Sequence, residues 1–440
     1  MADPVTTVPE ELRPEALGPP ERAFALLRRP DFRRAYAAVA VSELGDAFQY
    51  IALMWFALLA GGPLGVIAVR LADSVPALVF GLHGGVIADR WDRRRTMIGA
   101  DLVRGAVLVP VAAAGLAGHL PLAALVLAAF ALTAATSYFA PAYGALLPAL
   151  VDRRNVQQAN GLVRATADAL SVCGWALAAL LLSVLPITAF FALNAASFFL
   201  SAALLTGIRA GRRAGQEIPA GRPRVREEIP AGRPRVREGF AALRPRPALA
   251  ASVAVLGVAV TLSSGTWIVG VPELVRSTLG RSAGSFSLVA ASYALGSISA
   301  GAVLARRPVR RKALASLLAW TLYLPAYGLF AVAGSLGVAL AAGFGAGVGQ
   351  GSAWVLVNSA AQEEVPDRLL GRVTGLVALV HRGAHATGLL FVSPLFAVVA
   401  PQTVFAGAAL AIPLAGLAGV LVSDRGDGAR GRVRRRTRRS

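Results

Sequence analysis

Cysteine is nearly absent from this sequence, since Cys173 is the only one among 440 residues. A disulfide within the chain and a metal site built on cysteines are therefore excluded. Histidine is almost as rare, and no carboxylate stands at metal-ligand spacing from any of the four histidines. The sequence also lacks the GxxxxGK(S/T) phosphate-binding loop. We expect no metal ion, no cofactor and no ATP-driven step.

Charged residues are scarce as well. They make up 15% of the chain, whereas soluble domains contain about a quarter. Hydrophobic residues make up 56%, and the mean hydropathy is +0.61. The apolar residues come in blocks of about twenty, the length that a helix needs to cross a hydrocarbon core of roughly 30 Å. The composition predicts an all-α protein that crosses a membrane many times.

The formal net charge of +20 comes almost entirely from arginine, because Lys312 is the only lysine. Such a charge would suit a nucleic-acid-binding protein. The arginines, however, lie in short hydrophilic segments between apolar blocks, and no folded basic domain remains to hold a duplex. We interpret the excess as a determinant of topology, and we expect membrane lipids but no nucleic acid as partners.

The apolar blocks predict twelve transmembrane helices, in two sets of six on either side of a hydrophilic linker. The predicted spans are 35–59, 64–87, 97–116, 121–147, 160–184 and 187–208, then 248–271, 284–304, 313–332, 335–360, 372–396 and 402–422. They divide the chain into an N-terminal segment (1–34), an N-terminal bundle (35–208), a linker (209–247), a C-terminal bundle (248–422) and a basic tail (423–440).

Arginine falls in alternate loops, and this pattern fixes the expected orientation. The basic loops are 90–95, 153–154, 209–246, 306–312 and 368–372, together with the tail, whereas the other loops contain only Arg276 and Arg281. The positive-inside rule then places both termini and the linker in the cytoplasm. Because residues 1–34 contain no apolar signal-peptide core, we expect an uncleaved multi-pass protein of the plasma (cell inner) membrane.

Two internal repeats accompany the spans. GVIADRWDRRR at 85–95 is echoed by GAVLARRPVRRK at 301–312, with Ala305 where Asp89 would stand. A repeat at half the chain length indicates two pseudo-symmetric six-helix bundles, as in secondary transporters. The second repeat, EIPAGRPRVRE at 217–227 and again at 228–238, predicts a disordered linker near the anionic leaflet, with a binding module as the alternative.

Ionisable residues inside the spans are the candidate functional residues, because each is costly in lipid and usually faces an interior cavity. Glu43 and Asp46 share one face of the first span, with Tyr50 one turn further, and no base stands near them in sequence. Repulsion between two carboxylates favours one of them holding a proton, as a proton-coupling site requires. Asp46 lies nearer mid-membrane and is our first choice. The alternative for Glu43 is a side chain that extends towards the cytoplasmic surface.

The remaining candidates in the spans have possible counter-ions close by. They are Arg70 and Asp73, Arg164 and Asp168, Asp101 and Arg104 near the cytoplasmic end of the third span, and the cluster of His381, Arg382 and His385. For the acid–base pairs, the alternative is local neutralisation that merely allows the helix to insert. The spacing of the two histidines can bind zinc, but without a third ligand we interpret them as polar cavity lining. Among the aromatic residues we single out Tyr50 and Tyr138 as cavity lining.

The segment 85–95 follows the order Gly-x-x-Ala-Asp-Arg-x-x-Arg-Arg, which is more specific than a run of charge. It resembles the loop signature between the second and third helices of the major facilitator superfamily of transporters, with Asp92 where that family has glycine. Other stretches resemble its enterobactin-exporter-like and macrolide-efflux-like carriers: FRRAYAAVAVSELGDAF at 32–48, FAPAYGALLPALVDRRNVQQANGL at 139–162 and VPDRLLGRVTGL at 365–376.

This resemblance, which covers most of residues 30 to 422, implies a central cavity and alternating access by rocking of the two halves. It also implies a cytoplasmic gating loop, in which Asp89 accepts at the N-terminal end of the eleventh span. The residues of this predicted gate are Gly85, Asp89, Arg90, Arg93, Arg94, Gly371 and Arg372, and we group Asp101 and Arg104 with them. Two departures from drug antiporters are the lack of an arginine in span four and the loss of most of the glycine pattern in span five.

The sequence therefore predicts a proton-coupled exporter of small amphipathic molecules, such as drugs, antibiotics or siderophores, that acts as a monomer. An uptake carrier or facilitator on the same fold is one alternative. A membrane scaffold or sensor without transport activity is another. An enzyme is not expected, because no nucleophile, base and orienting group come together.

Overall fold

The structure, a computed structural model, describes residues 23–152, 155–209, 236–307 and 309–437, and every regular element in those ranges is helical. Side chains are described there except at 77–78, 81–90, 236–238, 367–368 and 424–437. The prediction of an all-α protein is confirmed. Most of the linker with its tandem repeat lies outside the described residues.

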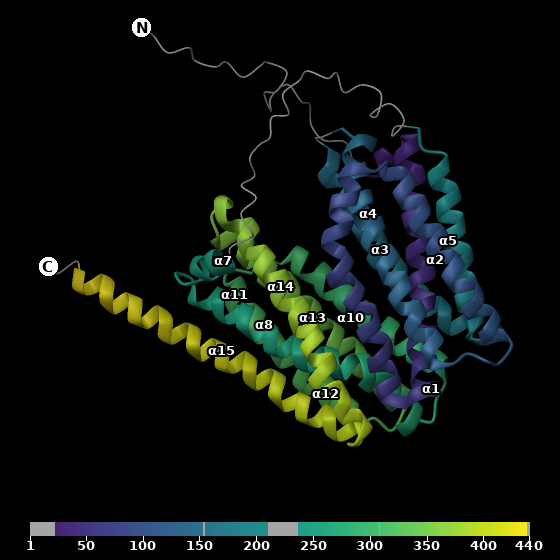
Figure 1. The fold of residues 1–440 in the computed structure, drawn as a ribbon. Helices are drawn as coiled ribbons and strands as arrows, with labels where there is room; N and C mark the ends of the chain where they lie inside the picture. The colour runs from purple at the N-terminus through teal and green to yellow at the C-terminus, as the bar shows by residue number, and fades with distance from the viewer. Residues whose placement is uncertain (1–22, 153–154, 210–235, 308, 438–440) are drawn as a thin grey trace, which may run out of the picture.

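The helices form two halves, which Figure 1 shows side by side, purple to teal and green to yellow. The N-terminal half contains η3 (Ala23–Arg28), α1 (Pro30–Arg90), α2 (Arg93–Leu116), α3 (Leu122–Leu150), α4 (Val156–Leu181) and α5 (Ala189–Thr206). The C-terminal half contains α7 (Val236–Leu243), α8 (Pro247–Gly265), η5 (Thr266–Gly270), α9 (Val271–Glu273), η6 (Leu274–Thr278), α10 (Ala283–Arg306), α11 (Lys312–Ala319), η7 (Trp320–Leu322), α12 (Tyr323–Ala331), α13 (Leu336–Glu364), α14 (Asp367–Phe391), η8 (Ser393–Ala397) and α15 (Pro401–Thr437).

Eleven helical stretches of the described chain are long and apolar enough to cross a membrane, so the prediction of a multi-pass membrane protein is confirmed. The label α1 covers 61 residues, but it contains two helices that correspond to the first two predicted spans. They are joined at a kink, where Gly61 and Gly62 have non-helical dihedral angles. A straight helix of that length would measure about 90 Å, roughly three hydrocarbon thicknesses, so the glycine pair must redirect the chain. The count of twelve spans stays a prediction.

The seventh predicted span is longer than expected, whereas the last one, Pro401–Ser423, matches the prediction and continues as a helix beyond its end. The seventh continues from α8 through the π-helical segments η5 and η6 as far as Thr278. Pro272 lies between those segments and cannot donate a backbone hydrogen bond, which disturbs the regular α-helical ladder there. Helix α15 continues beyond residue 422 to Thr437, so the backbone of most of the basic tail is helical.

Glycines bring α10 and α13 into close backbone contact. A Cβ on Gly347 would collide with the backbone carbonyl of Tyr293, and a Cβ on Gly296 would collide with that of Phe344. Small residues that allow backbones to approach are a common basis of helix association in lipid. The two helices therefore form a tight pair within the C-terminal half.

We expect Gly347→Ala to destabilise the protein by about 1–3 kcal/mol, because the neighbouring backbone of α10 has no free space to receive a methyl group. The measurement is thermal unfolding of the purified protein in detergent. Gly328→Ala is the matched control, since a Cβ at Gly328 would have no atom within 4 Å. Equal unfolding temperatures for the two variants would contradict the close packing of α10 on α13.

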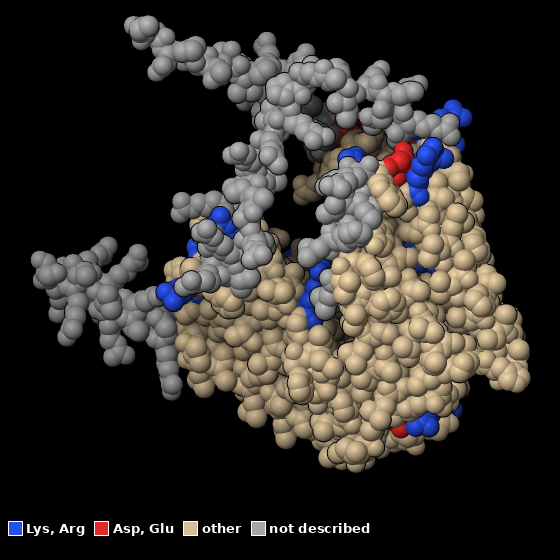
Figure 2. All heavy atoms as spheres, viewed as in Figure 1, with Lys and Arg blue, Asp and Glu red and all other residues tan. Residues whose placement is uncertain are grey.

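The two halves touch at the end that is remote from Pro30, the start of α1. The indole ring of Trp55 stacks on the Phe286 ring with 6.4 Å between centroids, and the Ser287 hydroxyl donates a hydrogen bond to the carbonyl of Trp175. Figure 1 shows the halves diverging towards the opposite end, and Figure 2 shows the surface hollowed between them there. The described structure is thus closed at one end and open at the other.

Candidate functional site

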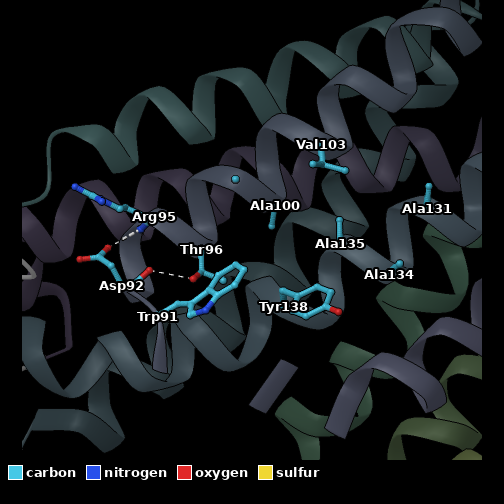
Figure 3. A pocket seen from close by; sticks show the side chains of 11 residues that line it. Trp91, Asp92, Arg95, Thr96, Ala100, Val103, Ala131, Ala134, Ala135 and Tyr138 are labelled. Atoms are coloured by element: carbon cyan, nitrogen blue, oxygen red, sulfur yellow. Dashed lines mark hydrogen bonds between the residues drawn. The ribbon is translucent and has the colours of Figure 1, made fainter. Parts of the chain in front are cut away.

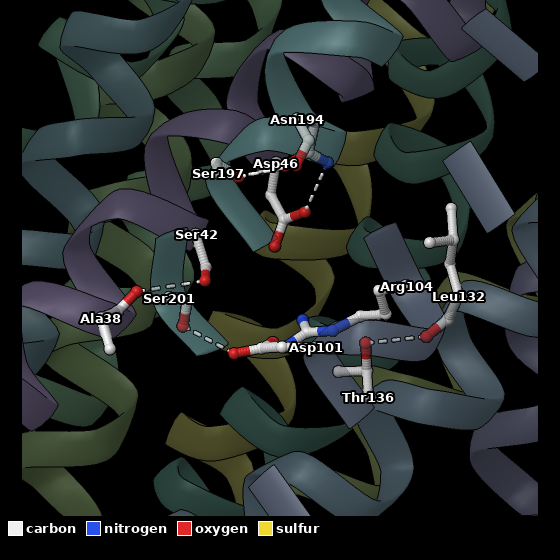
Figure 4. Close-up of polar contacts among 10 residues, drawn as sticks. All are labelled: Ala38, Ser42, Asp46, Asp101, Arg104, Leu132, Thr136, Asn194, Ser197 and Ser201. Atoms are coloured by element: carbon white, nitrogen blue, oxygen red, sulfur yellow. Dashed lines mark hydrogen bonds and ion pairs between the residues drawn. The ribbon is translucent and has the colours of Figure 1, made fainter. Parts of the chain in front are cut away.

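Asp46 lies on the first part of α1 and is half-buried among polar side chains of α5 (Figure 4). The Nδ2 of Asn194 donates to the Asp46 carboxylate at 3.1 Å and to Gln49 Oε1 at 2.5 Å. The Ser197 hydroxyl donates to Asn194 Oδ1 at 2.7 Å and fixes the orientation of the amide. Asn194 is fully buried. Gly45 makes this approach possible, because a Cβ there would collide with Asn194 and Ser197.

Asp101 and Arg104 form an ion pair in the interior of the N-terminal half, not at the cytoplasmic loop with which we grouped them. Their side chains are 0% and 4% exposed. The Ser201 hydroxyl donates to the second oxygen of Asp101 at 2.6 Å. The guanidinium carbon of Arg104 lies 4.2 Å from the ring centroid of Phe198 and 4.7 Å from that of Phe139. These contacts turn the pair inward, so that it lies in the same interior region as Asp46 and Asn194 (Figure 4).

Bases of other helices act on the two acids of the first span, although none stands near them in sequence. Arg104 of α2 interacts electrostatically with Asp46, and both Arg104 and Arg164 of α4 interact with Glu43. Glu43 is half-buried and makes no hydrogen bond within the described part of the chain. Bases from neighbouring helices therefore act on both carboxylates, which the sequence of one helix cannot show.

Arg70 and Asp73, on the second part of α1, form a local ion pair with 2.6 Å between Arg70 Nη1 and Asp73 Oδ2. The Thr133 hydroxyl of α3 donates to the other oxygen of Asp73. Arg70 also acts electrostatically on Tyr50 and on His385 of the C-terminal half. The pair is thus neutralised locally, yet its cation lies close to the boundary between the halves.

Arg164 and Asp168 form an ion pair of 3.0 Å on α4, with side chains 80% and 51% exposed. An exposed pair of this kind contributes little to stability. Local neutralisation is therefore the interpretation that the geometry favours. Because Arg164 and Asp168 both act on Glu43 electrostatically, the pair also contributes to the charge around the first span.

The histidines of α14 face an aromatic group in the C-terminal half. The centroids of the His381 and His385 rings lie 4.7 Å apart, and the Trp354 ring of α13 lies tilted against His381 at the same centroid distance. Arg382, between them in sequence, is exposed. His385 also borders a cavity of about 50 Å³ whose other lining residues include Ser264, Trp267, Tyr293, Tyr323 and Gln350. No group of three potential metal ligands occurs among the described residues.

The cavity beside His385 is lined by neutral hydrogen-bonding groups and aromatic rings. The rings of Trp267 and Tyr293 are tilted against each other with 4.1 Å between centroids, and the Tyr323 hydroxyl donates to Gln350 at 3.1 Å. Ser264 is 4% exposed, and its hydroxyl has no hydrogen-bond partner within the described part of the chain. A space of this size holds one or two water molecules or one small polar group.

The two tyrosines that we singled out lie in different places. Tyr50 packs on Trp175 with ring centroids 5.7 Å apart and on Phe286 at 6.4 Å, so it lies where the halves meet. Tyr138 borders a separate pocket of about 940 Å³ between α2 and α3 (Figure 3). Trp91, Asp92 and Thr96 line the same pocket, which therefore belongs to the loop end of the N-terminal half.

The arginines of the predicted gating loop bind helix ends of their own half. Arg93 donates to the carbonyl of Ala145 at 2.9 Å, near the end of α3. Arg94 donates to the carbonyls of Leu205, at 2.8 Å, and of Thr206, which are the last residues of α5. The last four carbonyls of a helix, which in α5 include those of Leu205 and Thr206, lack partners within the helix and favour cations. These contacts attach the loop to α3 and α5.

The rest of the predicted gate is only partly described. The side chains of Asp89 and Arg90 and the surroundings of Gly85 lie outside what the structure describes, as does any contact of Asp89 with α14. Gly371 and Arg372 lie in the first turns of α14 and are exposed. The latch between this loop and α14 stays a prediction.

Sequence reasoning missed Asn194 and Ser201, the α5 partners of Asp46 and Asp101. Asn194 is the only amide side chain in the span predicted at 187–208, and its presence in an apolar block was a usable signal. Its partner is 148 residues away in sequence, however, and no spacing rule connects them. The aromatic cavity beside His385 was missed as well, because its lining comes from several helices.

Two helical halves that pack around a polar interior and meet at one end are the architecture of secondary membrane transporters. The family model of the Major Facilitator Superfamily matches residues 35–389. The chain belongs to this superfamily, which confirms the prediction from the loop signature and implies a small-molecule substrate.

Curated relatives match parts of the chain. Macrolide efflux protein A of Streptococcus pyogenes is 30% identical over 167 residues, which cover 37% of this chain and 40% of that protein. The uncharacterized MFS-type transporter YkuC of Bacillus subtilis (strain 168) is 26% identical over 193 residues, 43% of this chain and 44% of that protein. The chain thus spans less than half the length of the curated relatives that it matches.

Solved structures share the fold over nearly the whole chain. A bacterial homolog of the human lysosomal transporter Spinster, in an inward-facing and unoccupied conformation, covers 92% of this chain and 95% of its own, with a TM-score of 0.56 and 13% identity. A mutant of the nucleoside transporter NupG covers 88% of this chain and 99% of its own, with a TM-score of 0.60 and 13% identity. At this identity the likeness concerns the fold alone.

Proposed function

We propose that this protein exports small amphipathic molecules from the cytoplasm in exchange for protons, as a monomer in the plasma membrane with both termini cytoplasmic. The observation that carries the proposal is the position of Asp46. It is a half-buried acid in a membrane-embedded half, with an amide partner on one side and the charge of Arg104 in reach. Ionisable groups in such places commonly serve proton relays.

The arginine-rich loops support the orientation. With those loops in the cytoplasm, the closed end at Trp55 and Phe286 faces outward and the open end faces inward. The hollow between the two halves then receives its substrate from the cytoplasm. The aromatic group beside His381 and His385 supplies apolar surface, and the small polar cavity next to it accepts a hydrogen-bonding group.

The relatives named for macrolide efflux support export as the direction and antibiotics as a substrate class. We include related amphipathic molecules, such as siderophores, because the interior offers neutral polar groups and aromatic rings without a charge pattern that selects one compound. In this proposal the arginine-bound loop at Arg93 and Arg94 holds the cytoplasmic side of the N-terminal half in shape during the rocking motion.

The experiment is transport into inverted membrane vesicles that contain the protein, with a radiolabelled macrolide and a fluorescent amphipathic dye as probes. We expect accumulation when the vesicle interior is acidified, and loss of it when a protonophore removes the gradient. Vesicles without the protein are the control. Equal internal and external probe concentrations in the presence of a gradient would indicate a facilitator instead. Probe movement only out of the vesicles would indicate uptake.

A further inference from the structure

A polar groove lies on the C-terminal half, away from the space between the halves. Its volume is about 510 Å³. Three segments form it: the turn between α7 and α8, the segment before α11 with that helix's first turn, and the end of α13. The groove residues used below are Arg246, Arg310, Arg311, Ala313, Leu314 and Glu364.

Three guanidinium groups and one carboxylate line this groove. Arg246 is held in place, because its Nε donates to the carbonyl of Glu364 at 2.5 Å and its Nη1 to the carbonyl of Ala242 at 2.6 Å. Arg310 and Arg311 are exposed and make no hydrogen bond or ion pair with the residues that the structure describes. Three cations against one acid leave the groove positively charged.

The start of α11 adds backbone donors to the same place. The helix begins at Lys312, and Ala313 and Leu314 of its first turn line the groove. The first amides of a helix have no carbonyl partner within the helix and carry part of the positive end of its dipole. Guanidinium groups together with such amides are the usual ligands of phosphate groups in proteins.

The position of the groove matches that of lipid headgroups. Helix α8 begins at Pro247, α11 begins at Lys312 and α13 ends at Glu364, so three spans have their ends at this level. Figure 2 shows arginine and lysine side chains at that end of the C-terminal half. Phe240 of the short helix α7 is 55% exposed there, whereas Ala242 and Leu243 are buried. An exposed aromatic ring beside arginines is typical of a membrane–water boundary.

We propose that this groove binds a phosphate-bearing anion. The source of the phosphate is either the headgroup of an anionic phospholipid or a free phosphate compound of the cytoplasm. Arg246, which is held by its two hydrogen bonds, contacts the anion without moving. The exposed side chains of Arg310 and Arg311 form ion pairs with the anion once it is bound. The site is separate from the transport route, so neither its presence nor its absence depends on the proposed export.

The test uses the full-length protein, purified in detergent and freed of lipid, in two arms. Native mass spectrometry measures binding of phosphatidylglycerol, with phosphatidylcholine as the zwitterionic comparison. Calorimetry measures binding of inorganic pyrophosphate. The variant is Arg310→Gln with Arg311→Gln. The matched control is Arg306→Gln with Arg307→Gln, which removes the same charge from exposed positions of the same loop outside the groove.

Each arginine near a headgroup is expected to strengthen binding about fivefold, so the double variant is expected to lose about 25-fold. The control pair is expected to keep the affinity of the unaltered protein. Loss of phosphatidylglycerol binding in the variant alone identifies a lipid site, and the same loss confined to pyrophosphate identifies a site for free phosphate compounds. Equal losses in variant and control, or no anion binding at all, would overturn the proposal. Unchanged thermal unfolding shows that each variant is folded.

Discussion

Asp46→Asn is expected to reduce gradient-driven efflux to the level of vesicles that lack the protein. The substitution preserves the size of the side chain and an oxygen that accepts from Asn194, so the contact between α1 and α5 stays. It removes the only feature that proton coupling needs, a group that takes up and releases a proton at working pH. The measurement is probe accumulation in inverted vesicles at equal protein levels, with and without an acid interior.

Two further measurements separate coupling from a general loss of activity. Exchange of labelled for unlabelled macrolide without a gradient is expected to continue in Asp46→Asn, because substrate binding and the rocking motion remain. Glu363→Gln, an exposed acid whose only described ion pair is with Lys312, is expected to behave like the unaltered protein. Full gradient-driven accumulation in Asp46→Asn would move the coupling site to Asp73 or Asp168.

Asp101→Asn is expected to destabilise the protein by about 3–5 kcal/mol, because it removes the carboxylate that forms an ion pair with the Arg104 guanidinium in the interior of a membrane-embedded half. The surroundings of Arg104 make this cost hard to avoid. Two phenylalanine rings flank the guanidinium, and its Nε is buried without a hydrogen-bond partner in the described part of the chain. Thermal unfolding in detergent and the amount of folded protein in the membrane are the measurements.

The double variant, Asp101→Asn with Arg104→Met, decides whether charge is the cause. It removes both charges and fills the space between the rings, so most of the lost stability is expected to return. A double variant as unstable as the sum of the single ones would show that side-chain packing, not the unpaired charge, accounts for the loss. Recovered stability with uncoupled transport would instead show that Arg104 contributes to the environment of Asp46.

The sequence predicted contacts within one helix much better than contacts between helices. The pairs Arg70–Asp73 and Arg164–Asp168 follow from spacings of three and four residues, which place side chains on one helix face. The partners of Asp46 and Asp101 on α5 follow from no spacing, because helix packing decides which faces meet.

Errors in the predicted site have the same origin. Tyr138 was predicted as cavity lining and borders a pocket between α2 and α3, and Asp101 and Arg104 were grouped with the gating loop but form the local ion pair that we gave as the alternative. In lipid every span is apolar on most sides, so hydropathy identifies the spans but not the side of each that faces the protein. The family resemblance predicted the fold correctly. It rests on a loop and several short stretches of sequence, and recognising these does not require knowing which side of each span faces the protein.

The glycine pair in α1 has a mechanical consequence for coupling. Asp46 lies before Gly61 and Gly62, on the part of the helix that is fitted closely against α5, and Arg70 lies after them. With non-helical geometry at both glycines, the two parts have separate helix axes, so a displacement of one part along its own axis is not an axial displacement of the other. We infer that a movement started at the acid reaches the far part of α1 sideways, through α3 and the contact between Thr133 and Asp73.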